Sequence, residues 1–230
     1  MTGGSLRCRV LADPDRLAAA AARRMLRAAD RAIAARGEFH LVLAGGRTPL
    51  PAYARLARAQ AQWPHWHLYF GDERWLPAGH PDRNETAVRR AWLDLVPIPA
   101  AQVHAIPAGP DPERAADSYR ALLAAVPAFD LVLLGLGADG HTASLFPGRR
   151  WGPGPVLVVR AAPGPHPLRI SLGVERLRCS RQLLFLVSGA DKRAALDAWR
   201  RGGSLPAAAV AEGHPRALVL LDAAADPGRG

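Results

Sequence analysis

The sequence predicts an α/β fold of the Rossmann-like kind, in which a parallel sheet is flanked by helices. Apolar runs of strand length alternate along the chain with alanine-rich amphipathic segments, as in repeated βα units. Several runs, such as LVLLGLG and LLFLVS, are apolar at successive positions, which is typical of strands covered on both faces. Because the chain has 230 residues and 49% of them are hydrophobic, we expect one substantial core and a single domain spanning residues 1–230.

The expected strands follow the apolar runs in chain order, and each belongs to the parallel sheet. They are Phe39–Ala44, His67–Phe70, Val103–Ile106, Phe129–Gly135, Val156–Arg160, Leu168–Leu172, Gln182–Ser188 and Ala217–Leu221.

Helices fill the gaps between these strands. Asp13-Pro14 and Asp111-Pro112 each place a capping side chain before a proline at the first helical position. We therefore expect helices to begin there and to run to about Arg36 and Ala125. Further helices are expected at Pro49–Gln60, Asn84–Leu95 and Asp191–Arg200. The Pro/Gly-rich stretch Gly148–Pro167 is short enough to be a loop, with room for a small excursion from the sheet.

The charge balance is strongly basic, with a formal net charge of +10. Of the 30 basic residues only Lys192 is a lysine, which together with abundant Ala, Gly and Pro indicates codon bias from a GC-rich genome. No basic cluster is interleaved with stacking aromatic residues, so no nucleic acid partner is expected. A lysine that survives such a bias is a candidate for a position that needs a compact ammonium group.

Targeting and redox signals are missing from the sequence. No apolar run is long enough to cross a bilayer, and Met1–Val10 lacks the pattern of a secretory signal. We therefore expect a cytoplasmic protein with no membrane partner. Cys8 and Cys179 have neither CxxC nor zinc-type spacing, which argues against a disulfide framework or a thiolate metal site.

Ligands of parallel α/β sheets bind beyond the carboxyl ends of the strands, so the loops that follow the strands are candidate sites. After the first strand, Gly45 and Gly46 permit a tight turn, Thr48 can cap the next helix, and exposed N–H groups form a seat for a phosphate. The loop matches neither the Walker pattern nor GxGxxG, which disfavours nucleotide binding. A purely structural Gly-Gly turn is the alternative interpretation.

Three charged residues, Asp72, Glu73 and Arg74, directly follow the strand HLYF. A charged cluster at the carboxyl end of a strand indicates a site, and a solvated turn with an Asp–Arg pair is the alternative.

The loop after Phe129–Gly135 carries the most specific pattern, because Asp139 and His141 flank Gly140. Imidazole can take a proton from water near neutral pH, and the carboxylate can orient either the ring or a substrate hydroxyl. Exposed glycine N–H groups could stabilise an oxyanion. The alternative is a structural Asp-Gly turn beside a surface histidine. The chain has no GxSxG motif, so Ser144 is expected to pack or cap rather than attack.

Two later cations complete the candidate site. Arg169 lies in the otherwise apolar strand LRISL, where a guanidinium is costly to bury without an anionic partner. Lys192 follows the strand LLFLVS. Both residues are expected beside the ends of the strands.

Six motifs follow one another along nearly the whole chain. They are LAGGRTP, HLYFGDERWLP, RNETAVRRAWLD, FDLVLLGLGADGHTASLFPG, LRISL and VSGADKRAAL. Taken together and in this order, they closely resemble the 6-phosphogluconolactonase family. The deaminases that resemble this family typically have DEY and GHIAFNEPG, where this chain has DER and GHTASLFPG.

The resemblance implies the fold of glucosamine-6-phosphate deaminases and ribose-5-phosphate isomerases, and hydrolysis of 6-phosphoglucono-1,5-lactone without a metal or an organic cofactor. It implies that His141 is the general base and Asp139 its supporting carboxylate. A small-molecule phosphosugar lactone is the expected partner, and the chain is expected to be a monomer, with a dimer as the alternative. The implied phosphate-binding group is Gly45, Gly46, Arg47, Thr48, Arg169 and Lys192, with Asp72, Arg74 and Gly140 near the substrate.

Some positions depart from the family pattern. Arg47 and Arg83 stand where many members carry serine, and Gly148–Pro167 looks compressed. Two other functions remain open, namely a sugar-phosphate isomerase or deaminase and a non-catalytic sugar-phosphate-binding regulator. A regulator would be expected to lack the base or to carry a DNA-binding segment. The sequence retains His141 and shows no helix-turn-helix segment.

Overall fold

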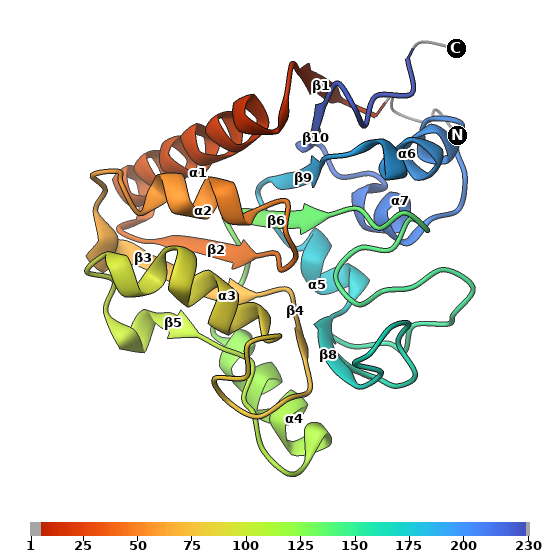
Figure 1. Ribbon diagram of the computed structural model, residues 1–230. Coiled ribbons are helices and arrows are strands. Elements are labelled where there is room, and N and C mark those ends of the chain that lie inside the picture. The colour runs from red at the N-terminus through yellow and green to blue at the C-terminus, as the bar shows by residue number, and fades with distance from the viewer. Residues whose placement is uncertain (1–5, 229–230) are drawn as a thin grey trace.

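A seven-stranded sheet forms the centre of the computed structural model, which describes residues 6–228 (Figure 1). Its strands lie in the order β1-β10-β9-β6-β2-β3-β5, and neighbouring strands are parallel. The prediction of an α/β fold with a parallel sheet flanked by helices is therefore confirmed. The strands are β1 (Cys8–Leu11), β2 (Phe39–Leu43), β3 (Trp66–Phe70), β5 (Val103–His104), β6 (Leu131–Gly135), β9 (Leu183–Val187) and β10 (Ala217–Asp222).

A second, antiparallel sheet contains β4 (Asp72–Arg74), β8 (Arg169–Leu172) and β7 (Val156–Val159) in that order. The strands predicted at 156–160 and 168–172 exist, but their assignment to the parallel sheet was wrong. A parallel connection needs a crossover of about a dozen residues or more, and the segment 160–168 is too short to provide one. Asp72–Arg74 forms a strand and not the solvated turn of the alternative interpretation, and Gly71 alone separates it from β3.

Seven α-helices surround the sheets within residues 6–228. Asp13 caps α1 by accepting from the N–H of Arg16, and Asp111 caps α4 by accepting from the N–H of Glu113, as predicted. No helix in this range is both long and apolar enough to traverse a lipid bilayer. The helices are α1 (Pro14–Arg36), α2 (Leu50–Leu56), α3 (Asn84–Ala91), α4 (Pro112–Ala124), α5 (Val174–Arg178), α6 (Arg193–Arg200) and α7 (Pro206–Ala211).

The helices cover both faces of the parallel sheet. On one face, Trp66 of β3 packs edge to face against Trp92 at the end of α3, with ring centroids 5.7 Å apart. Tyr69 lies three residues further along β3 and so points to the other face, where it contacts Phe129. The guanidinium of Arg176, on α5, lies 4.1 Å from the centre of the Phe129 ring. The strands are consequently buried on both sides, as their apolar runs predict.

Two buried tyrosines hold the chain where β2 and β3 end. The Tyr53 hydroxyl, on α2, accepts from the N–H of Ala44 and donates to its carbonyl. The Tyr119 hydroxyl, on α4, makes the same two contacts with Phe70. Where a strand ends, its backbone groups lose their partners on the neighbouring strand. The two hydroxyls supply partners there and so fix the points at which two candidate loops leave the sheet.

Candidate active site

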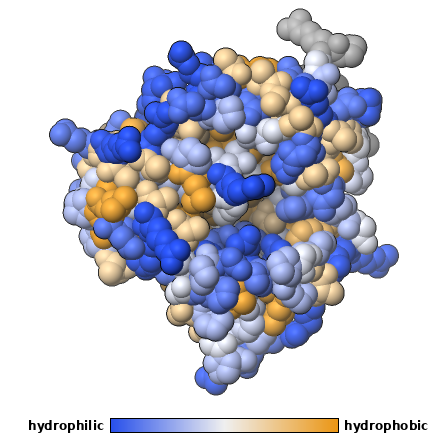
Figure 2. All heavy atoms as spheres, viewed as in Figure 1, coloured by the Kyte–Doolittle hydropathy of each residue, from blue (hydrophilic) through white to orange (hydrophobic). Residues whose placement is uncertain are grey.

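A cavity of about 520 Å³ lies beyond the carboxyl ends of β2, β3, β6 and β9. In the space-filling view the surface is hollowed near the middle of this face, with hydrophilic side chains around the hollow (Figure 2). Of the residues predicted for the site, only Asp139 and Gly140 do not line the cavity. The predicted residues that line it are Gly45, Gly46, Arg47, Thr48, Asp72, Arg74, His141, Arg169 and Lys192.

His141 and Asp139 form a pair at the rim of this cavity. Asp139 Oδ1 lies 2.5 Å from His141 Nδ1 and accepts the backbone N–H of His141 at 3.0 Å. Partial burial raises the pKa of Asp139, but the backbone and side-chain hydrogen bonds from His141 outweigh this effect and lower it below the ordinary value. Asp139 therefore contacts the histidine and remains an anion at neutral pH.

Gly137 leaves the space in which this pair sits. A Cβ atom at Gly137 would lie 2.0 Å from His141 Nδ1 and 2.5 Å from Asp139 Oδ1, so no larger residue fits without moving the pair. Gly140 has a φ of +88°, a conformation that favours glycine.

The oxyanion role predicted for the glycine N–H groups of this loop is wrong for Gly137 and Gly140. Gly137 donates to the carbonyl of His141 and Gly140 donates to the carbonyl of Gly137. Both groups hold the turn together, because a loop this tight must satisfy its backbone donors internally.

The loop after β2 leaves its backbone donors free. Within residues 6–228 the N–H groups of Gly45, Gly46 and Arg47 donate to no protein acceptor. Gly46 has a φ of +82°, and a Cβ atom on Gly45 would lie 2.0 Å from Asn84 Oδ1. Thr48 does not cap α2, contrary to prediction, because residues 47–49 form a turn and the helix begins only at Leu50.

Asp72 is buried on the cavity wall and held at both carboxylate oxygens. Oδ1 accepts from Asn84 Nδ2 at 3.2 Å, and Oδ2 accepts from Ser144 Oγ at 2.6 Å. Ser144 is itself buried, and its N–H donates to Ser171 Oγ at 3.2 Å. The expectation that Ser144 packs rather than attacks agrees with these contacts, and the residue lies in a turn.

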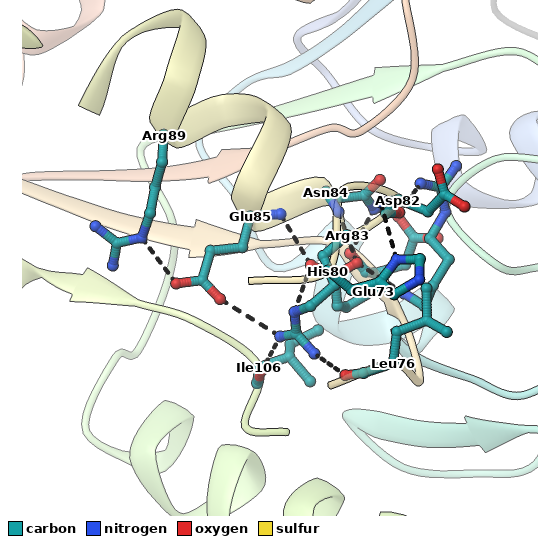
Figure 3. Close-up of polar contacts among 11 residues, drawn as sticks. Glu73, Leu76, His80, Asp82, Arg83, Asn84, Glu85, Arg89 and Ile106 are labelled. Atoms are coloured by element: carbon teal, nitrogen blue, oxygen red, sulfur yellow. Dashed lines mark hydrogen bonds and ion pairs between the residues drawn. The ribbon is translucent and has the colours of Figure 1, made fainter. Parts of the chain in front are cut away.

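The buried carboxylate of Glu73 fixes the start of α3 behind the cavity (Figure 3). It accepts from the N–H groups of Arg74, Asn84 and Glu85. Burial raises the pKa of Glu73, and these N–H groups together with Arg83 offset part of that effect. Glu73 thereby positions Asn84, the residue that holds Asp72.

Arg83 is almost completely buried beside Glu73, and its guanidinium joins three segments (Figure 3). It donates to the carbonyls of Leu76 and Ile106, at 3.0 and 2.7 Å, and Nε lies 3.7 Å from Glu73 Oε2. The arginine at this position is therefore structural and does not face the cavity.

Arg74 and Arg169 are opposite each other on the paired strands β4 and β8. Arg169 is half-buried, and its guanidinium donates to the carbonyls of His166 and Pro163. Burial is the main cause that lowers its pKa, with Asp72 acting in the opposite direction and Arg74 reinforcing the decrease. Two like charges at directly opposed positions repel, which makes this wall of the cavity attractive to an anion.

Lys192 and Arg47 line the cavity from the segments that follow β9 and β2. Lys192 Nζ is 2.8 Å from Asp191 Oδ2, and this contact, with a smaller contribution from Arg47, lowers the pKa of the exposed Asp191. Sequence reasoning missed Asp191, Asn84 and Gly189, which also line the cavity. Asn84 belongs to the motif RNETAVRRAWLD, and Gly189 and Asp191 belong to VSGADKRAAL, but the sequence does not show which residues of these motifs face the cavity.

No group of three or more His, Cys, Asp or Glu side chains within residues 6–228 is arranged to hold a metal ion. The predicted phosphate-binding cations come from both sheets, since Arg47 and Lys192 follow the parallel strands β2 and β9 and Arg169 lies on β8 of the antiparallel sheet.

Comparisons with known proteins agree on one family. A family model described as glucosamine-6-phosphate isomerases/6-phosphogluconolactonase matches residues 12–219. The chain is 43% identical over 176 residues to a 6-phosphogluconolactonase of Synechocystis, covering 72% of this chain and 73% of that one. It is 41% identical to a 6-phosphogluconolactonase of Streptomyces coelicolor, covering 93% and 90%. The crystal structure of the Thermotoga maritima 6-phosphogluconolactonase superposes with a TM-score of 0.87 at 27% identity, covering 94% and 99%. The chain therefore belongs to the family of glucosamine-6-phosphate isomerases and 6-phosphogluconolactonases.

Proposed function

We propose that this protein is a 6-phosphogluconolactonase, an enzyme of the pentose phosphate pathway that hydrolyses 6-phospho-D-glucono-1,5-lactone to 6-phospho-D-gluconate. The observation that carries the proposal is the His141–Asp139 pair at the rim of a cavity that also offers free backbone donors and cations. Two relatives that are more than 40% identical bear the same name.

The contact with Asp139 determines which nitrogen of His141 acts. Because the carboxylate accepts the proton on Nδ1, Nε2 carries the lone pair. Nε2 takes a proton from water while the water oxygen attacks the lactone carbonyl. The tetrahedral intermediate collapses, the bond from carbonyl carbon to ring oxygen breaks, and the imidazolium returns its proton to that oxygen.

The substrate phosphate binds to the free N–H groups of Gly45, Gly46 and Arg47, with Lys192 supplying an ammonium charge. Asp191 holds the ammonium in place before substrate arrives. Asp72 and Arg74 contact the sugar. Since a lactone is already an activated ester, its hydrolysis mainly requires a positioned base and a phosphate-binding site, and no cofactor is needed.

The chain acts as a cytoplasmic monomer without a nucleic acid partner. Within the described part of the chain, the large exposed hydrophobic residues are Val10, Leu95 and Leu122, and they lie on separate elements instead of along one helix or strand face. Size-exclusion chromatography with light scattering at micromolar concentration tests this statement, and a mass near twice 24.5 kDa would contradict it.

The decisive experiment follows proton release from freshly made 6-phosphogluconolactone with the wild type, His141→Ala and the exposed control His65→Ala. The expected result is loss of nearly all rate enhancement in His141→Ala and none in the control, while both variants still bind phosphogluconate. A fully active His141→Ala would remove the base from the mechanism. If the wild type consumed glucosamine 6-phosphate and left the lactone unchanged, the lactonase proposal itself would be wrong.

A further inference from the structure

A second cavity, of about 280 Å³, lies between α1 and the part of the parallel sheet formed by β1, β10 and the start of β9. Gln182, just before β9, lines this cavity, whereas Ser188, just after β9, lines the candidate active site. Helix α1 connects the two regions, because its first residues border the active site and its later turns border the second cavity. The arginines lining the second cavity are Arg9 from β1 and Arg23, Arg24, Arg27 and Arg31 from α1.

These arginines have no carboxylate partner among residues 6–228. Other arginines of the protein pair with acids, as Arg160 does with Glu113 and Arg200 with Asp226. Across residues 6–228, none of the five forms an ion pair, and the one side-chain hydrogen bond of the group runs from Arg24 Nη2 to Gln182 at 3.5 Å. Arg24 Nε is buried and has no acceptor.

The arrangement concentrates positive charge. Arg23, Arg27 and Arg31 are spaced four residues apart and so lie along one stripe of α1, with Arg24 beside it and Arg9 on the adjacent strand. Burial lowers the pKa of Arg24, and the nearby Arg31 and Arg9 lower it further. The repulsion is an electrostatic cost to the fold, and a bound anion would offset it.

The shape of the cavity selects the kind of anion. Guanidinium groups bind phosphate oxygens through paired hydrogen bonds. At a rise of about 1.5 Å per residue, the α-carbons of Arg23 and Arg31 are about 12 Å apart, so the stripe is long enough for several linked phosphates to contact more of its arginines than a single phosphate would. No aromatic side chain lines the cavity, so there is no surface on which a base would stack.

We propose that this cavity is a binding site for a compact oligophosphate, meaning two or more linked phosphate groups that are either free or carried by a nucleotide. The phosphates bind between the α1 stripe and Arg9, and Arg24 Nε receives its missing acceptor. The site is separate from the lactonase cavity and does not depend on the proposed function.

Calorimetric titration with tripolyphosphate and with ATP at low salt tests the proposal. The proteins are the wild type, Arg24→Gln/Arg27→Gln, Lys192→Ala and a control, Arg58→Gln/Arg90→Gln, that loses the same charge from exposed positions on other elements. The expected result is binding that weakens about tenfold or more in the first variant. Binding stays within about twofold of the wild type in the other two, and lactonase activity is unchanged in Arg24→Gln/Arg27→Gln.

Several outcomes would overturn the proposal. Unchanged affinity in Arg24→Gln/Arg27→Gln would mean that these arginines do not bind the anion. An equal loss in the control would mean that the anion senses only net charge. Loss in Lys192→Ala would place the anion in the active site. Tighter binding of a duplex DNA fragment that depends on the same arginines would identify a nucleic acid surface instead. If the double variant fails to fold, Arg27→Gln alone, at an exposed position, must weaken binding. ATP binding much more tightly than tripolyphosphate would contradict recognition through phosphates alone.

Discussion

Single residues of the candidate active site are held by two different kinds of contact. His141 is fixed by its near neighbours, since Asp139 binds its ring and Gly137 leaves room for it. Asp72 is fixed by residues far away in the sequence, Asn84 and Ser144. Local patterns can be recognised in a sequence, and the histidine loop was recognised. The role of Asn84 could not be, because it exists only once β4, α3 and the histidine loop have come together.

Replacing Asp139 with asparagine is expected to lower kcat about 10²- to 10⁴-fold, because the amide neither fixes the Nδ1–H tautomer nor balances the charge of the imidazolium.

The lowered pKa of Asp139 also predicts that its contribution to stability depends on pH. Ionised Asp139 stabilises the fold above its ordinary pKa, and this contribution is lost as the pH falls through the lowered value. In denaturant titrations, the free energies of unfolding of the wild type and of Asp139→Asn should therefore differ at pH 7 and converge in acid. A constant difference would contradict this prediction.

Lys192→Ala is expected to raise KM for the phosphorylated lactone at least about tenfold with a smaller change in kcat, because the ammonium charge holds a part of the substrate that does not react. Steady-state kinetics on the phosphorylated and unphosphorylated lactones separate the two effects. Arg193→Ala, the adjacent exposed cation, serves as the control. Equal damage with the unphosphorylated lactone would show that Lys192 does not bind the phosphate.

At the level of elements, the pairing of neighbouring strands brings distant residues together. His40 of β2, His67 of β3 and His104 of β5 stack on one face of the parallel sheet, with Glu38 beside the first two. Burial, followed by the nearby His67 and His40, lowers the pKa of His104 to about 4. Each of these histidines looks isolated in the sequence.

This histidine stack predicts sensitivity to acid. Because the unfolded chain binds a proton at His104 more readily than the folded chain does, stability should fall as the pH falls from about 6.5 to about 4. His104→Gln should reduce that slope, and His65→Gln, at an exposed position, should not. Urea titrations across this pH range provide the measurement. An unchanged slope in His104→Gln would show that other groups cause the loss.

The connection between β4 and α3 predicts a structural phenotype for Arg83. Removing its guanidinium in Arg83→Ala leaves the carbonyls of Leu76 and Ile106 without a donor and the buried Glu73 without its countercharge. We expect a loss of about 3 kcal/mol in the free energy of unfolding. The exposed Arg90→Ala, on α3, is the control in the same denaturant titrations. A loss below about 1 kcal/mol would show that the buried network is dispensable.

The sequence predicted those strands of the parallel sheet that have long apolar runs. It did not predict strands that are short or that pair with a segment far away along the chain. The segment Asp72–Arg74 resembles a charged turn and becomes a strand only by pairing with β8, almost a hundred residues later. β1, with an edge position and half its residues exposed, lacks the apolar run that marks a buried strand. The short helices α5 and α7 carry too few turns to show a clear period.

Over the whole molecule, the basic residues behind the net charge of +10 are distributed unevenly, and the sequence did not show where they gather. Arg23, Arg27 and Arg31 have the spacing of an ordinary solvated helix face, so the sequence indicated only codon bias. Their meeting with Arg9 depends on α1 packing beside β1.

Self-repulsion at this net charge predicts that salt stabilises the protein. Raising sodium chloride from about 10 to about 150 mM shortens the Debye length from about 30 to about 8 Å and should raise Tm. Scanning calorimetry of the wild type and of Arg24→Gln/Arg27→Gln measures the effect, and the variant should show a smaller rise. A Tm that falls with salt in both proteins would contradict the prediction that repulsion dominates over attractive pairs.

The contact between Asp139 and His141 spans only two residues of chain, and this has a consequence for how the enzyme can change over evolutionary time. Substitutions within one short segment are enough to gain or lose the base, whereas substrate preference depends on residues contributed by both sheets and several loops. Substitutions in those remote parts can therefore accumulate and exchange one sugar phosphate for another while the proton-transfer unit is inherited intact.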